Sequence, residues 1–168
     1  TYKITADQVR KGNFAAYGTN INGRLDQDKI TANVSLSDRA GVEQFALKAD
    51  MSMTGDTQVV RLLPGLKLNY KDWDVAQPNR IVLGDGSFYV SNFNISNSGQ
   101  FLKANSVESK PNTPLNVDIS NFLISNITEM ASPTDTISVN GILGAAITIQ
   151  KITPSPSITG DVDIQNLS

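Results

Sequence analysis

The sequence predicts an all-β protein built from antiparallel strands, and three observations lead to this class. Apolar and polar residues alternate strictly in several segments, and no segment of helical length repeats with a period near 3.6. Asn, Ser and Thr make up 45 of the 168 residues whereas only 18% are charged, a composition that suits strands with one dry and one wet face. Short motifs also recur. We expect residues 1–168 to be a single repetitive β domain, a fragment of a longer protein.

Composition excludes several classes of function. The net charge is −2 and Lys and Arg are scattered, so the electrostatic footprint of a nucleic-acid-binding protein is missing. The sequence contains no Cys and no His, which excludes disulfides, thiolate metal sites and a Ser-His-Asp triad. No apolar run reaches the length of a membrane-spanning helix. We therefore expect no enzyme activity and no cofactor.

The clearest strands are residues 30–36 and 45–53, where every second residue is apolar. The connecting segment 37–44 contains the turn-forming run Asp-Arg-Ala-Gly, so the two segments predict an antiparallel hairpin. The same alternation predicts shorter strands at residues 66–70, 88–90 and 115–119.

One short helical turn is predicted at residues 127–131, because Asn126 and Glu129 have the spacing of a capping box.

A motif with sequence SNFNISN at residues 91–97 recurs as SNFLISN at 120–126 and more loosely as IQNL at 164–167. In each copy the apolar alternation slips by one residue at an asparagine, which would turn later side chains to the opposite face unless a bulge corrects it. These asparagines are Asn92, Asn121 and Asn166. Since Asn tolerates the left-handed conformation that some bulges need, we predict a bulge or bend at all three.

Glycines in the pattern apolar-x-Gly-x-apolar lie at Gly23, Gly141 and Gly160. Glycine inside a strand marks a bulge or a close approach of backbones.

Few side chains offer chemistry. The carboxylates come close together in three pairs, which are Asp26 with Asp28, Asp72 with Asp74, and Asp161 with Asp163. A calcium site or an acid/base pair is one interpretation, and solvated loop or wet-face positions are the one we favour. The only tryptophan, Trp73, could stack on a sugar or lie at a membrane interface, but we expect it to cap a core.

The apolar face of the predicted strands is the remaining candidate site. It would either form the core of an ordinary β-sandwich or line an open trough that shields acyl chains from water, at about 25 cal/mol per Å² buried. The candidate lining residues are Ile30, Val34, Leu36, Phe45, Leu47, Met51, Met53, Leu66, Leu68, Phe88, Val90, Phe93, Ile95, Val117, Ile119 and Phe122. Methionine suits adaptable contact with varied chains.

Several segments in consistent order give the chain a resemblance to a known family. They are LPGLKLNYKDW at residues 63–73, NRIVL at 79–83, FYVSNFNIS at 88–96, GQFL at 99–102, VNGILG at 139–144 and VDIQNLS at 162–168. The chain resembles the C-terminal region of TamB-like proteins (translocation and assembly module B) of the AsmA-like superfamily, especially the form in Bacteroidetes, over about residues 15–168.

This resemblance implies an elongated, curved antiparallel sheet, a β-taco, groove or half-barrel, with an apolar concave interior. It also implies a periplasmic bridge in the Gram-negative cell envelope, anchored in the inner membrane, that conducts phospholipid acyl chains to the outer membrane. An outer-membrane barrel of the Omp85 family would be a partner. Two alternatives stay open: a scaffold or chaperone-like module in outer-membrane protein assembly, and an adhesin or carbohydrate-binding sandwich.

Overall fold

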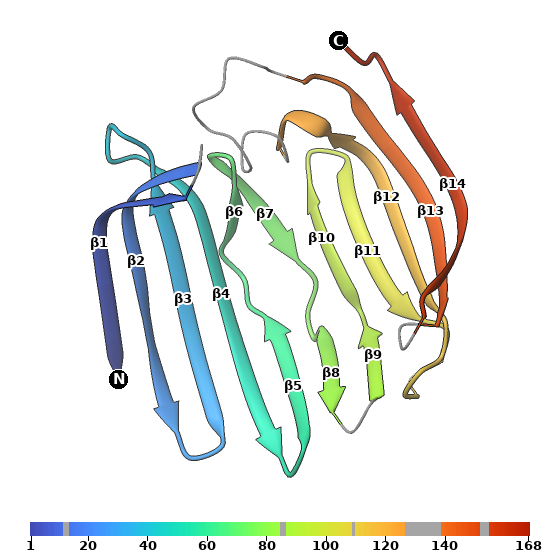
Figure 1. Cartoon of the computed structure of the whole chain (residues 1–168), viewed down its shortest axis with the longest axis horizontal. Coiled ribbons are helices and arrows are strands. Elements are labelled where there is room, and N and C mark those ends of the chain that lie inside the picture. Colours follow the sequence, from blue (N-terminus) through green and yellow to red (C-terminus); the bar gives the residue numbers. More distant parts are fainter. Residues whose placement is uncertain (12–13, 85–86, 109, 127–138, 152–154) are drawn as a thin grey trace.

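The structure is a computed structural model that describes residues 1–11, 14–84, 87–108, 110–126, 139–151 and 155–168. These residues form one open antiparallel sheet of 14 strands, which confirms the predicted all-β antiparallel class (Figure 1). The strands are β1 (Tyr2–Lys11), β2 (Phe14–Asp26), β3 (Lys29–Ser37), β4 (Glu43–Thr54), β5 (Thr57–Leu62), β6 (Leu66–Leu68), β7 (Lys71–Val75), β8 (Arg80–Gly84), β9 (Ser87–Ser91), β10 (Phe93–Asn97), β11 (Gln100–Ser106), β12 (Leu115–Leu123), β13 (Ile142–Lys151) and β14 (Ser157–Gln165).

The strands follow one another up and down across the sheet, from β1 at one edge to β14 at the other. In the middle, β4 pairs with both β5 and β6, β8 pairs with β5 and β9, and β7 pairs with β6 and β10. The pairs β5–β6, β7–β8 and β9–β10 are therefore long strands, each interrupted once. The described residues form one layer, not the two facing sheets of a sandwich.

Asn79 bridges the interruption between the central strands. Its side chain is fully buried. Its Oδ1 accepts a hydrogen bond from Leu62 N, and its Nδ2 donates to Leu62 O and Ala76 O, each at 2.8 Å. The amide thus replaces ladder hydrogen bonds that the interrupted strands cannot make with each other, which keeps buried backbone groups paired.

The predicted hairpin is confirmed as β3 and β4, where Leu36 lies opposite Phe45 and Val34 lies opposite Leu47. Asp38 begins the connecting turn, because its Oδ1 accepts hydrogen bonds from Ala40 N at 2.8 Å and Val42 N at 2.9 Å. The predicted short strands at residues 88–90 and 115–119 lie within β9 and β12.

The prediction of a strand over residues 66–70 was too long. The strand β6 ends at Leu68, and Asn69 and Tyr70 form the turn into β7 with φ angles of 50° and 64°. Positive φ at both central residues is the conformation of a two-residue hairpin turn whose twist matches the strands. The predicted helical turn at residues 127–131 lies outside the described residues, and residues 124–126 just before it are helical.

The bends predicted at the three motif asparagines are confirmed. Asn92, Asn121 and Asn166 have φ angles of 52°, 51° and 53°. The β12–β13 register shifts between Ile119 and Phe122, where Asn121 lies. Gly160, with φ 149°, also fits its predicted role, because a Cβ atom there would overlap the carbonyl oxygen of Ala146 on β13. The left-handed conformation of these asparagines keeps the apolar side chains before and after them on the same side of the sheet.

Candidate functional site

The strand register brings the predicted apolar residues onto one face of the sheet, here called the apolar face. Residues directly opposite each other in an antiparallel pair share a face. One row of such partners runs Met51, Val60, Ile81 and Val90 across β4, β5, β8 and β9. All sixteen predicted residues belong to the apolar face by this register, so the structure groups them as the sequence predicted.

The same rows continue through the C-terminal half of the sheet. Ile95 lies opposite Leu102, which lies opposite Ile119, which lies opposite Ala145. The sequence reasoning missed several members of this face, although alternation was present around most of them. The missed residues are Ile4, Ile21, Leu25, Val60, Leu62, Ile81, Leu83, Leu102, Leu143 and Ile147.

A compact core cluster lies in the middle of the apolar face. Leu66, Trp73, Ile95 and Phe122 are buried there and pack together. The indole of Trp73 lies 5.4 Å from the Phe122 ring, which agrees with the predicted role of Trp73 in capping a core. The apolar side chains that pack around this cluster are partly buried.

Toward both edges the apolar face is open to solvent. On the N-terminal side, Leu25 is 62% exposed and Leu47 is 41% exposed. On the C-terminal side, every residue of β14 is exposed, including Val162 at 61%. Apolar side chains therefore remain open to solvent on both sides of the core.

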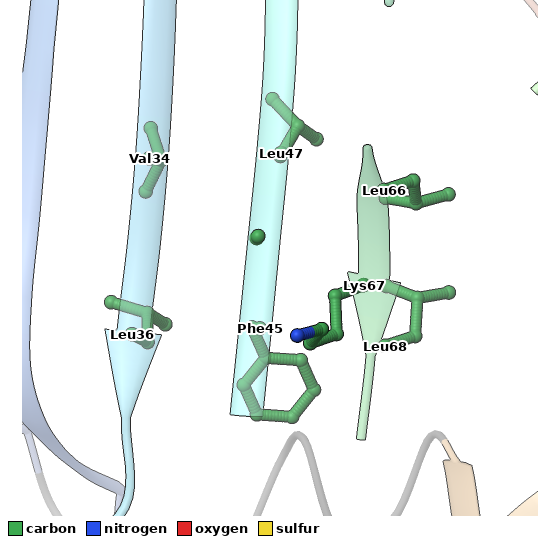
Figure 2. A pocket seen from close by; sticks show the side chains of 8 residues that line it. Val34, Leu36, Phe45, Leu47, Leu66, Lys67 and Leu68 are labelled. Carbon is green, nitrogen blue, oxygen red and sulfur yellow. The ribbon is translucent and has the colours of Figure 1, made fainter. Parts of the chain in front are cut away.

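One apolar pocket of about 260 Å³ lies on this face at the end of β3, β4 and β6 (Figure 2). Val34, Leu36, Phe45, Leu47, Leu66 and Leu68 line it, together with Ala46 and Lys67 of the intervening positions. The six large apolar side chains are all residues that the sequence predicted for the site.

Most charged residues of the strands lie on the opposite, hydrated face, and Lys71, opposite Leu68, is an exception. Cross-strand neighbours there include the ion pair between Arg61 and Asp50 at 4.0 Å. Lys67 Nζ lies 3.2 Å from Glu43 and 3.7 Å from Asp72, and its hydrogen bond to Glu43 is the main cause that raises the pKa of Lys67. The two faces therefore differ in charge.

Two of the carboxylate pairs have a member engaged by a cation. Asp26 accepts a hydrogen bond of 2.9 Å from Arg24, and Asp72 lies beside Lys67. Within the described ranges, no group of three or more potential metal-ligating side chains comes together.

The fold and the site define a class: an open antiparallel sheet with one apolar and one hydrated face. The chain matches no protein-family model, and no curated protein or solved structure is significantly similar to it. Among the described residues no helix has the length and apolar character needed to cross a membrane.

Proposed function

We propose that this chain is a lipid-conducting segment of a TamB-like bridge in the periplasm of a Gram-negative cell envelope. The observation that carries the proposal is the apolar face, which is continuous across the sheet and open to solvent on both sides of its small core. Acyl chains lie against this face and head groups stay in water. Transport needs no catalytic residue, since the driving force is removal of apolar surface from water.

The contact between Trp73 and Phe122 supports a concave groove. Trp73 on β7 and Phe122 on β12 are separated by β10 and β11, so three strand spacings of about 4.8 Å would hold their backbones about 14 Å apart in a flat sheet. Their rings nevertheless lie 5.4 Å apart. Side chains that converge in this way favour a sheet that bends toward its apolar face, as the taco or half-barrel of the family does.

The resemblance to TamB-like proteins supports the same function, and it supplies the location and the outer-membrane barrel of the Omp85 family as partner. Phospholipid acyl chains are the cargo that the apolar lining fits.

Substitution of Leu47 tests the proposal, because its side chain is on the apolar face and 41% exposed, so a charge there disturbs the surface without entering the core. We expect Leu47→Asp to lower the lipid retained after incubation with phospholipid vesicles, measured by native mass spectrometry. Ser52→Asp is the matched control on the same strand, since Ser52 lies on the hydrated face opposite Lys29. Equal retention by both variants, or no lipid on the wild-type chain, would reject lipid conduction.

A scaffold in outer-membrane protein assembly is the second candidate, favoured by the free edge of β14. This strand pairs only with β13 within the described residues, and all of its residues are exposed. An unpaired edge can accept a further strand. A photo-reactive residue at Thr159 that captures polypeptide, together with one at Leu47 that captures no lipid, would favour the scaffold.

A further inference from the structure

Lys71 differs from the other charged side chains of the sheet in its position. It lies directly opposite Leu68 across the β6–β7 hairpin, and Leu68 lines the apolar pocket. Among the described side chains of β2 to β12, Lys71 is the one charged group that the register places on the apolar face. Asp72, its neighbour along the strand, points to the hydrated face, where it lies beside Lys67.

The Lys71 ammonium is available for a ligand. Lys71 is exposed, and no ion pair within the described residues includes it. Lys67 on the same hairpin is instead held by two carboxylates. The carboxylate of Asp38 lies at the same end of the sheet, but Tyr70 Oη and the backbone N–H groups of Ala40 and Val42 already donate to it.

The geometry points to a binding site for an anionic phospholipid, with one acyl chain in the apolar pocket and the phosphate head group at Lys71; this inference rests on the proposed function. Opposite residues in an antiparallel pair have Cβ atoms about 5 Å apart, so the lysine stem lies beside the pocket wall. The stem covers apolar surface while the ammonium reaches water, which is where the head group of a lipid in the pocket would be. The charge then selects acidic over zwitterionic head groups.

The experiment offers the whole chain vesicles that contain equal amounts of phosphatidylglycerol and phosphatidylcholine with identical acyl chains. The bound lipids are then extracted and quantified. We expect the wild-type chain to be enriched about two- to five-fold in phosphatidylglycerol, the range that one exposed ion pair provides. Lys71→Gln should bring the ratio close to that of the vesicles.

Lys48→Gln is the matched control, because Lys48 is exposed on the hydrated face opposite Asn33 and the substitution removes the same charge. It should keep the wild-type ratio. Lipid bound without preference by the wild-type chain, or a preference that survives in Lys71→Gln, overturns this inference and leaves lipid conduction standing. Absence of any bound lipid rejects the proposed function as well. Unchanged thermal unfolding of both variants verifies that each is folded.

Discussion

The indole ring of Trp73 lies 5.4 Å from the phenyl ring of Phe122, although β10 and β11 separate their strands. The two rings are tilted by 38° and belong to the small buried core on the apolar face. This contact joins two parts of the sheet that backbone hydrogen bonds do not join directly. It therefore links these two parts of the sheet through side-chain packing.

Truncation of either ring should be among the most destabilising changes in the chain. We expect Trp73→Ala and Phe122→Ala each to lower the free energy of unfolding by about 3–5 kcal/mol, since both remove a buried aromatic side chain. A double-mutant cycle should give a coupling energy of about 1 kcal/mol, as found for aromatic pairs. Urea denaturation followed by tyrosine fluorescence measures both quantities.

Phe101→Ala provides the comparison, because Phe101 lies on the hydrated face. There the Lys103 ammonium lies 4.3 Å from the centroid of the Phe101 ring. Its removal should cost clearly less than that of Phe122. Equal losses at Phe101 and Phe122 would mean that the Trp73 contact does not organise the sheet.

Asn79 should be required for the stability of the sheet at the place where its central strands are interrupted. Asn79→Ala leaves the N–H of Leu62 and the C=O of Ala76 without the partner that Asn79 provides, whereas the C=O of Leu62 keeps its hydrogen bond from Gln77 Nε2. Each of these two groups costs about 1–3 kcal/mol, so we expect a total loss of about 2 kcal/mol or more. Hydrogen exchange at the Leu62 amide should accelerate in parallel. Asn33→Ala is the control, because it removes an exposed hydrogen bond from Asn33 to Asn22. It should change the free energy of unfolding by less than about 0.5 kcal/mol.

Alternation in the sequence was sufficient to predict some of the strands and sixteen residues of the apolar face. It located the β3–β4 hairpin and placed Leu36 and Phe45 on the same face, as the register has them. It also located three of the asparagines with positive φ, Asn92, Asn121 and Asn166, because a slip in parity has a local cause in the backbone conformation.

The interruptions of the central strands could not be predicted in this way. The break between β5 and β6 depends on Asn79, which is 17 residues from Leu62 in the sequence. The end of β6 was missed because Tyr70 continues the apolar alternation but adopts a positive φ, which aromatic residues seldom do. The contact of Trp73 with Phe122 joins residues that are far apart in the sequence, so no local pattern encodes it.

The bend at Asn121 gives a prediction about backbone conformation. Asn121→Gly keeps the positive φ at no steric cost and should leave stability nearly unchanged, apart from the exposed 3.3 Å hydrogen bond from Nδ2 to Gly99 O. Asn121→Val forces a β-branched residue into the left-handed region and should cost about 2 kcal/mol. Asn116→Val, in the extended part of the same strand, is the control that should be tolerated. If both valine variants unfold at the same urea concentration, the positive φ at Asn121 is not needed.

The turn after β3 gives a prediction about protonation. Hydrogen bonds from the backbone N–H of Val42, and next from the hydroxyl of Tyr70, hold the pKa of the Asp38 carboxyl below its usual value. Because the folded-state pKa is lowered, the stabilising contribution of Asp38 is complete above the unfolded-state pKa and is lost as the pH falls through the folded-state pKa.

Tyr70→Phe removes one donor, so we expect the pKa of Asp38 to rise toward its usual value and the acid-sensitive window to move upward. A carboxyl-carbon NMR titration of Asp38 reads the pKa directly, with Tyr2→Phe as control, since the Tyr2 hydroxyl donates to Thr31 O at 3.3 Å. An Asp38 pKa that is the same in the wild-type chain and Tyr70→Phe would show that the backbone donors alone set it.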